Sequence, residues 1–186
     1  MSIRNEDRKS TQKDSVTGEF AATPTWFAVE TSPRHEKKVA AELTNKGVDC
    51  LLPLFAAERQ WSDRRQVVQL PVFPGYVFVQ IAPISENRLP VLQTNGVRRF
   101  VGVRGTGIPI EDSEMDAVRR ITAGDTPFQP HPYPKTGQRV RIRDGSLRGI
   151  EGILLSINGD QSLVVSLELI GRSMAMRLTG YAVDPA

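Results

Sequence analysis

The chain has 186 residues and a formal net charge of +3; 39% of its residues are hydrophobic and 24% are charged. These values are ordinary for a globular protein of one or two small domains and exclude disorder throughout the chain. No apolar run reaches the roughly 18 residues that a membrane span needs, and the polar segment 1–15 is unlike a secretory signal, so we expect a cytoplasmic protein without a membrane anchor.

The residue pattern gives no support for catalysis or metal binding. His35, His131 and Cys50 lie far apart in different kinds of segment, which excludes the usual metal-ligand spacing, and the single cysteine excludes an internal disulfide. The phosphate-binding and nucleophile motifs G-x-x-x-x-G-K-[ST], G-x-G-x-x-G and G-x-S-x-G are absent from the sequence. We therefore expect no catalytic residue, no metal and no cofactor.

The N-terminal part predicts a flexible tail, a strand and a helix. Residues 1–23 are polar, mixed in charge and without period, which is typical of a tail. A first strand is expected at residues 26–30. Ser32 is suited to cap a helix with Pro33 at its first position. The buried positions and the glycine stop of this helix are expected at Val39, Leu43 and Gly47.

Four basic side chains crowd the first turn of that helix, where the helix dipole favours acids. They are Arg34, His35, Lys37 and Lys38. One explanation is that exposed cations tolerate a few tenths of a kcal/mol of unfavourable dipole energy. The other is an anion, such as a DNA phosphate, bound at the helix N-terminus.

A second strand is expected at residues 48–53, followed by a hairpin over residues 57–70. The tip of the hairpin, residues 62–65, is polar and includes Arg64 and Arg65. Such a tip is either a solvated loop or a contact to nucleic acid.

The stretch 70–81 is the part around which the chain is organised. Residues 76–81 are apolar at five of six places and predict a central strand covered on both faces. Just before it, Phe73-Pro-Gly-Tyr76 predicts a rigid turn that presents aromatic surface. The ordinary alternative is that both rings lie in the core.

Three further elements complete the N-terminal part. We expect a short helix within residues 83–96, limited by Pro90, and a strand at residues 97–103. A second long helix is expected at residues 110–121, with acids at its start and arginines at its end, in agreement with the helix dipole. Its buried stripe is predicted to consist of Met115, Val118 and Ile121.

The last third of the chain changes character. Residues 122–136 carry four prolines, which predicts a semi-extended linker. In the segment that follows, Val140 and Ile142 alternate with arginines, so one face of the expected strand is apolar and the other basic. Short strands are expected at residues 153–157, 163–169 and 173–178, with Asn158-Gly159 as a hairpin turn.

These elements, in this order, resemble the NusG family of transcription elongation factors over residues 25–186. The tryptophan-led strand, the helix after Ser32 and the Phe73-Pro-Gly-Tyr-Val-Phe-Val element are similar to the family's N-terminal (NGN) domain, and residues 135–186 are similar to its C-terminal KOW domain. The resemblance implies an α+β fold: an antiparallel sheet flanked by helices at 24–121, a Pro-rich linker at 122–136, and a small five-stranded SH3-like β-barrel at 137–186.

The resemblance also implies a function by binding. The aromatic turn would take the tip of the clamp helices in the β′ subunit of RNA polymerase and hold the clamp closed, which suppresses pausing or termination. The implied polymerase-binding residues are Phe73, Pro74, Gly75, Tyr76 and Phe78. Non-template DNA would meet Arg34, His35, Lys37, Lys38, Arg64 and Arg65. The KOW motif would consist of Arg139, Arg141, Arg143, Gly145, Gly149 and Gly152.

Several sequence details are most similar to the specialised UpxY, LoaP and RfaH type of antiterminator, which acts on long operons such as those for polysaccharides. They include Thr31-Ser-Pro-Arg-His-Glu36 and Trp61-Ser-Asp-Arg-Arg65. One departure is Asn87-Arg88-Leu89, which stands where RfaH has the His-Thr-Thr segment that touches the polymerase gate loop. We expect a monomer whose KOW domain is a barrel from the outset, since Gly145, Gly149, Gly152 and Gly159 disfavour a helical form.

Three other interpretations remain open. A housekeeping NusG-type factor would couple polymerase to Rho or to a small-subunit ribosomal protein through the KOW domain. A ribosome-associated RNA-binding protein could use the same barrel, whose basic face is otherwise simply solvated. A nucleic-acid enzyme would need clustered carboxylates, but the acids at residues 111–116 are explained by the helix start.

Overall fold

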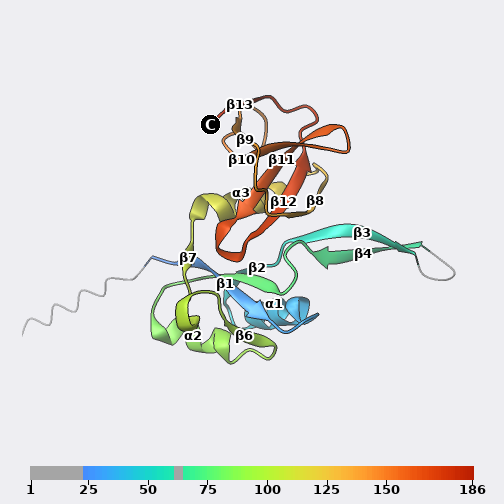
Figure 1. Cartoon of the computed structure of the whole chain (residues 1–186). Coiled ribbons are helices and arrows are strands. Elements are labelled where there is room, and N and C mark those ends of the chain that lie inside the picture. Colours follow the sequence, from blue (N-terminus) through green and yellow to red (C-terminus); the bar gives the residue numbers. More distant parts are fainter. Residues whose placement is uncertain (1–22, 61–64) are drawn as a thin grey trace, which may run out of the picture.

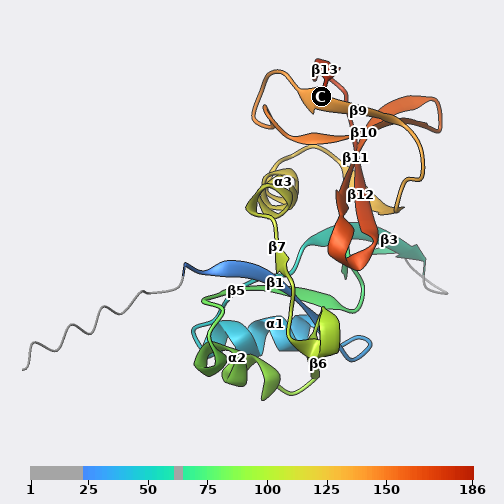
Figure 2. The ribbon, with the colours of Figure 1, turned by 60° about the vertical axis from the view of Figure 1, so that its left-hand side comes forward.

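The computed structural model describes residues 23–60 and 65–186, in which helix α3 (Asp112–Ala123) lies between two sheets (Figures 1 and 2). The N-terminal sheet has the strand order β2-β5-β1-β6, with β7 also paired to β1. Its strands are β1 (Thr25–Thr31), β2 (Asp49–Leu51), β5 (Tyr76–Ile81), β6 (Val97–Phe100) and β7 (Pro109–Ile110). The C-terminal part is an all-β sheet, so the predicted α+β class is confirmed.

Strand β5 is central, as predicted, and antiparallel to both of its neighbours. In the β1–β5 register Ala28 lies opposite Phe78, and Glu30 lies opposite Tyr76. Directly opposed side chains share a face of the sheet, so these four residues lie on one face. That face is turned toward α3, whereas α1 (Glu36–Asn45) and α2 (Ser85–Leu92) cover the other face.

Helix α1 begins three residues later than predicted. His35 is its N-cap residue, with no side-chain cap, and the helix starts at Glu36, so the cap assigned to Ser32 was wrong. The reason is that residues 32–35 form a tight turn, in which the His35 N–H donates to Ser32 O at 3.0 Å and Arg34 has a φ of 64°. A left-handed residue cannot belong to a right-handed helix.

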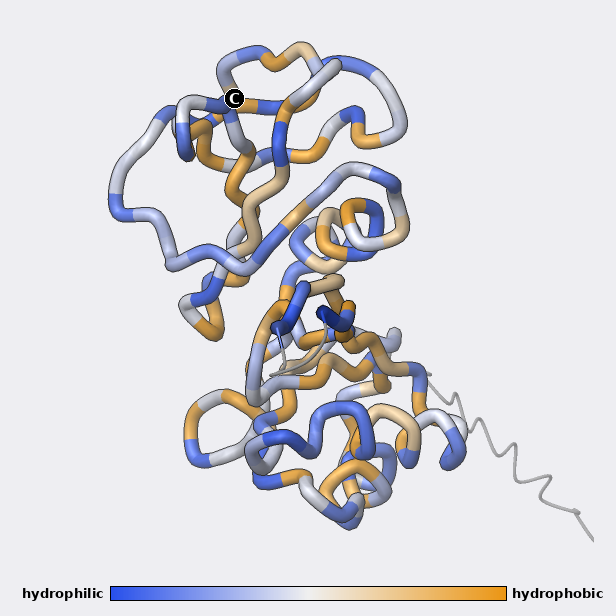
Figure 3. The backbone as a smooth tube through the Cα atoms, turned by 90° about the vertical axis from the view of Figure 1, so that its right-hand side faces the viewer, coloured by the Kyte–Doolittle hydropathy of each residue, from blue (hydrophilic) through white to orange (hydrophobic). Residues whose placement is uncertain are grey.

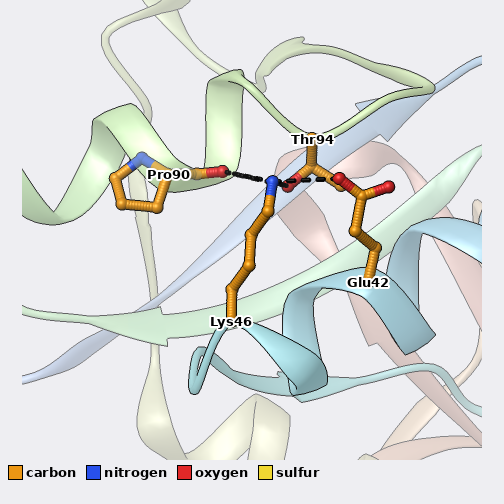
Figure 4. Close-up of polar contacts among 4 residues, drawn as sticks. All are labelled: Glu42, Lys46, Pro90 and Thr94. Atoms are coloured by element: carbon orange, nitrogen blue, oxygen red, sulfur yellow. Dashed lines mark hydrogen bonds and ion pairs between the residues drawn. The ribbon is translucent and has the colours of Figure 1, made fainter.

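The end of α1 is fastened to α2 by one lysine (Figure 4). Lys46 Nζ donates to Thr94 Oγ1 at 2.8 Å and to Pro90 O at 3.4 Å, and it lies 3.0 Å from Glu42 Oε1. Glu42 and Lys46 therefore form an ion pair one turn apart on α1. Pro90 lies inside α2, which continues to Leu92, so it does not limit the helix as expected.

Other boundaries of the N-terminal part differ slightly from the prediction. β6 ends at Phe100, and a short 3-10 turn, η1 (Val103–Gly105), follows it. Helix α3 starts at Asp112 because Ile110 belongs to β7. The predicted buried stripe of α3, which consists of Met115, Val118 and Ile121, is confirmed. Figure 3 shows α3 lying between the two halves with both hydrophobic and hydrophilic residues along its turns.

Strands β3 (Leu54–Gln60) and β4 (Arg65–Pro71) form a separate two-stranded hairpin that extends from the body of the protein (Figure 1). The predicted hairpin is present and begins three residues earlier than expected. Residues 61–64 at its tip, including Arg64, lie outside the described residues.

The C-terminal sheet, which we call the barrel, has six strands in the order β13-β9-β10-β11-β12-β8. It includes a 3-10 turn, η2 (Glu168–Ile170), between β11 and β12. The strands are β8 (Phe128–Pro132), β9 (Gln138–Ile142), β10 (Glu151–Ile157), β11 (Asp160–Leu167), β12 (Arg172–Arg177) and β13 (Val183–Pro185).

Strand β8 lies in the segment that was predicted to be a linker. It pairs with β12, with Pro130 opposite Met174 and Pro132 opposite Arg172, so residues 128–132 are part of the sheet. Two prolines spaced by two residues fit an edge strand, because both missing N–H groups point away from the one neighbour. The segment that was expected to be a semi-extended linker therefore includes an edge strand of the barrel.

Two local predictions for the barrel are confirmed. Asn158 and Gly159 have φ values of 53° and 87° and join β10 to β11 in a two-residue hairpin turn. Val140 and Ile142 are buried while the arginines between and beside them are exposed. None of the helices among the described residues is long and apolar enough to cross a membrane.

Candidate functional site

The aromatic turn, residues 73–76, is less exposed than the sequence suggested. Phe73 is 1% exposed and Phe78 is fully buried, and their rings meet edge to face with centroids 5.7 Å apart. The expectation that Phe73 and Phe78 belong to an exposed aromatic surface was therefore wrong, because both rings lie in the core. Tyr76 is half-buried and Pro74 is exposed, so the rim of the turn reaches solvent.

The two phenylalanines are buried because both halves of the molecule contribute to one apolar cluster. The cluster contains Trp26 and Ala28 of the N-terminal sheet, Met115 of α3, and Leu167 and Met174 of the barrel. Leu169 and Ile170, both from η2, pack against it. Figures 1 and 2 show the β11–β12 turn, which carries η2, pointing toward the N-terminal half beside β3.

The backbone of the aromatic turn is held from both sides. The Tyr76 N–H donates to Phe73 O at 3.2 Å, which closes the turn, and the Thr31 N–H donates to Gly75 O at 2.8 Å. The Gly75 N–H in turn donates to Oε1 of Glu36 at 2.8 Å. Gly75 has a φ of 88°, which is where glycine is needed. The turn is therefore rigid, as predicted.

The basic residues of the 32–38 segment do not all reach solvent equally. Arg34, Lys37 and Lys38 are exposed, and Arg34 stands at the tip of the tight turn. His35 is half-buried: its Nδ1 lies 2.9 Å from Pro33 O, and a Cβ added to Gly96 would meet its side chain at 3.0 Å. The ring of His35 is thus held against the protein, and the three cations are the exposed part of the segment.

Two arginines that the sequence analysis did not single out lie beside this segment. Arg98 and Arg99 are exposed on β6, next to Val97, which pairs with Thr31. Glu30 holds both: Arg98 Nη1 lies 3.2 Å from its Oε1, and Arg99 Nε lies 2.6 Å from its Oε2. The dipeptide Arg98-Arg99 within a short strand was the available signal, because alternation alone would bury one of the two side chains.

The hairpin contributes one described residue to the predicted nucleic-acid set. Arg65 is the first residue of β4 and is exposed, opposite Gln60. Arg65 thus lies on the hairpin that extends from the body of the protein, whereas Arg34 precedes α1 and Lys37 and Lys38 lie on α1 (Figure 1).

The predicted KOW residues lie on β9, on the turns that follow it and, in the case of Gly152, on β10. Arg139 and Arg141 both pair with Glu151, and Arg143 Nη1 lies 3.6 Å from Asp184 Oδ1. The basic face is therefore partly neutralised. Gly145 and Gly149 have φ values of 75° and 87°, in the region that favours glycine.

Gly152 does not form a bend. It lies within β10, and a Cβ there would stand 2.6 Å from Val164 O and 3.0 Å from the side chain of Leu163. The glycine is needed for the close approach of β11.

A cavity of about 500 Å³ lies between α3 and the barrel. Glu114 of α3 and Glu168 of η2 line it, together with Arg120 and Arg139. Burial raises the pKa of Glu114, and the nearby Glu168 carboxylate acts in the same direction. Among the described residues no three His, Cys, Asp or Glu side chains gather as metal ligands.

The arrangement defines a protein of two packed units, a helix-covered antiparallel sheet and a small β-barrel, with surfaces suited to binding. The family model "Transcription termination factor nusG" matches residues 24–119, which is more than half of the chain. The chain therefore belongs to the NusG family of transcription termination and antitermination factors.

Individual relatives agree with this assignment. The chain is 29% identical to the transcription termination/antitermination protein NusG of Borreliella burgdorferi, over 80% of this chain and 91% of that protein. It is 27% identical to the Bacillus subtilis protein of the same name, over 86% and 97%. A solved structure of Thermotoga maritima NusG, described as showing a domain interaction, is similar in fold, with a TM-score of 0.53 and 24% identity, and covers 85% of this chain and 94% of that one.

Proposed function

We propose that this chain binds the clamp helices of RNA polymerase and acts without catalysis as an elongation and antitermination factor. The observation that carries the proposal is the rigid turn of residues 73–76, held by Thr31 and Glu36. A preorganised turn with aromatic residues binds a partner at low entropic cost. The half-buried Tyr76 is the first ring that such a partner would meet.

Because Phe73 and Phe78 are buried, binding to polymerase would also require a rearrangement of the chain. Both rings share their cluster with α3 and the barrel, so a partner reaches them only after the barrel has moved away. The arrangement described above is then a resting form, and polymerase competes with the barrel for the same face of the sheet. We take the two units as residues 24–121 and 137–186, with β8 moving as part of the second.

The effect on transcription is a shift in populations. A factor that prefers the active form of polymerase by about 1.4 kcal/mol changes the ratio of active to paused complexes roughly tenfold. Such an effect needs no covalent step. A factor that acts on polymerase would work where polymerase does, in the cytoplasm.

We further propose that Arg34, His35, Lys37 and Lys38 contact non-template DNA, and that the chain serves particular long operons such as those for polysaccharide biosynthesis. Exposed cations that surround a tight turn are suited to phosphate contacts. Arg98 and Arg99 extend the same basic surface. The DNA contact would select the operon, while the aromatic turn would supply the affinity for polymerase.

Two measurements test this function. Purified chain should bind polymerase elongation complexes and shorten pauses in single-round transcription; the absence of binding would rule the proposal out. Mapping of the chain along the genome then decides its scope, since a specialised factor occupies a few long operons. A housekeeping factor would instead follow polymerase everywhere, and a ribosome-associated protein would copurify with ribosomal RNA and not with polymerase.

A further inference from the structure

Glu36, the first residue of α1, is the only charged residue that is buried among the described parts of the chain, at 6% exposure. A buried carboxylate is costly unless hydrogen bonds and favourable dipoles compensate for its lost hydration. Glu36 has both kinds of compensation. It lies in the first turn of α1, where the helix dipole favours an acid, and its Oε1 accepts a hydrogen bond from the Gly75 N–H at 2.8 Å. This bond joins α1 to the aromatic turn.

Gly75 is held on both sides by one short segment. Its N–H donates to Glu36, and its carbonyl oxygen accepts the Thr31 N–H at 2.8 Å. Thr31 and Glu36 are the residues that bracket the tight turn 32–35. The aromatic turn and the basic turn are therefore fastened to each other, and Glu36 supplies the only side chain in the two hydrogen bonds that connect them.

The basic turn is itself strained. Arg34 is a non-glycine residue with a φ of 64°, and the turn is kept in place by hydrogen bonds from the N–H of His35 to Ser32 O and from the N–H of Ser32 to Gly96 O. Non-glycine residues in this region of backbone space cluster at binding sites and switches. Glu36 follows the turn directly, so the conformation of the basic turn sets the position of the residue that holds Gly75.

We propose that Glu36 is a positioning residue that couples the two binding surfaces, so that nucleic-acid contact at Arg34 and polymerase contact at Tyr76 strengthen each other. This inference rests on the proposed function, because it takes polymerase and DNA as the two ligands. Both ligands select the conformation in which the two turns are fastened, so that either ligand raises the population to which the other binds. The coupling is reciprocal by thermodynamic necessity.

A double-mutant cycle measures this coupling. Arg34→Ala, Tyr76→Ala and the double variant are prepared in the parent chain and in the Glu36→Gln and Glu36→Met backgrounds. Their Kd values are measured on an RNA polymerase elongation complex with an exposed non-template strand. Gln keeps an oxygen that accepts the Gly75 N–H, whereas Met keeps the size of the side chain and removes the acceptor.

In the parent and in Glu36→Gln, the loss of affinity in the double variant should differ from the product of the two single losses by about five-fold or more. In the Glu36→Met background, the loss of affinity in the double variant should equal the product of the two single losses. Glu42→Met is the matched control, because Glu42 lies on the same helix and faces Lys46 instead of Gly75. It should keep the parent's coupling.

The amide proton of Gly75 supplies a signature that is independent of polymerase. Its chemical shift should stay downfield in Glu36→Gln and move upfield in Glu36→Met, while the rest of the spectrum shows a folded chain. Single variants that weaken binding but combine multiplicatively in every background would overturn this inference alone. A parent chain that does not bind the elongation complex overturns the proposed function as well.

Discussion

Arg120 reaches from α3 into the barrel and donates through one nitrogen to a backbone carbonyl: Nη2 lies 2.7 Å from Ser146 O. The same nitrogen lies 2.9 Å from Arg148 O. The preceding residue, Arg119, turns to the other half of the molecule, where its guanidinium lies over the Trp26 ring at 4.8 Å from the centroid. Two consecutive arginines of α3 thus contact the N-terminal sheet and the barrel.

Replacement of Arg120 by Ala should loosen the junction between α3 and the barrel. Hydrogen bonds from a charged donor contribute about 1.5–3 kcal/mol each, and partial exposure lowers this, so we expect a loss of about 2 kcal/mol in the free energy of unfolding. Urea denaturation measures it. Arg148→Ala is the control, since its side chain is exposed and only its backbone oxygen accepts the bond. Equal stability of the two variants would contradict this role for Arg120.

The junction should also respond to pH through Glu114. The pKa of its carboxyl is raised by burial between α3 and the barrel. A raised pKa means that the folded form binds the proton more tightly, so stability is highest below the ordinary value of 4.5 and falls as pH rises through the folded pKa. The carboxylates of Glu168 and Glu111 also raise the pKa of Glu114, and the other charged residues that line the same cavity are Asp116, Arg120, Arg139 and Glu151.

Glu114→Gln removes this penalty and keeps an acceptor for the Glu168 N–H, which lies 3.5 Å from Glu114 Oε1. The variant should therefore be more stable than the parent at pH 7 and match it near pH 4. Thermal unfolding across this range tests the prediction. A difference that does not change with pH would show that the charge of Glu114 is not responsible.

Alanine variants of Tyr76 and Phe78 should have different effects, the first on polymerase binding and the second on the stability of the fold. Tyr76→Ala should cost on the order of 2 kcal/mol of affinity for polymerase and leave the chain folded, because the ring lies at the rim of the site. Phe78→Ala should lower the free energy of unfolding by about 3–5 kcal/mol, because the ring is fully buried. Polymerase-binding assays and denaturation curves of both variants test these two expectations. Unchanged polymerase binding by Tyr76→Ala would show that this ring only packs.

The arginines held by Glu30 should contribute to DNA binding. The double variant Arg98→Ala, Arg99→Ala should bind single-stranded DNA more weakly and show a smaller salt dependence, because each lost phosphate contact reduces the slope of log K against log salt. Glu30→Gln should strengthen binding, since it frees both guanidinium groups.

The control for this pair is a double alanine variant at Arg139 and Arg177, which are equally exposed but lie on the barrel. Filter binding at several salt concentrations gives the slopes. Identical slopes for the two double variants would place the DNA elsewhere.

Gly152→Ala should destabilise the barrel. The new methyl group would stand 2.6 Å from Val164 O, which is backbone and cannot turn aside. Overpacking of this kind costs about 1–3 kcal/mol. Gly124→Ala is the matched control, because a Cβ there meets its nearest atom at 3.4 Å and the residue has an ordinary φ of −88°. Denaturation curves that coincide for the two would refute the close approach.

The sequence was sufficient wherever a local pattern decides the structure. The apolar run of β5, the alternation around Val140 and the Asn158-Gly159 turn each predicted their element correctly, because side-chain period and backbone preference act over a few residues. The prolines of β8 misled the prediction, because their tolerance depends on an edge position that only the partner strand creates.

The candidate site was less predictable, because its exposure depends on tertiary contacts. The rigid Phe73-Pro-Gly-Tyr76 turn was predicted correctly, but the cover supplied by α3 and η2 comes from residues about 40 to 100 positions away and leaves no local signal. The cluster of Glu30, Arg98 and Arg99 was also unpredictable from local sequence. Each residue is ordinary in its own segment, and only the pairing of β1 with β6 brings the charges together.

The pairing of β8 with β12 sets how far the barrel can travel from α3. While β8 stays paired, only residues 124–127 connect the two, so a released barrel remains within about 20 Å of the end of α3. At such a short tether the effective concentration of the barrel at its resting place is in the millimolar range or above, and any competitor must overcome it. If β8 separates from β12, the tether grows to residues 124–137 and about 50 Å. One edge strand therefore sets the length of the tether, and that length decides how strongly the barrel is drawn back.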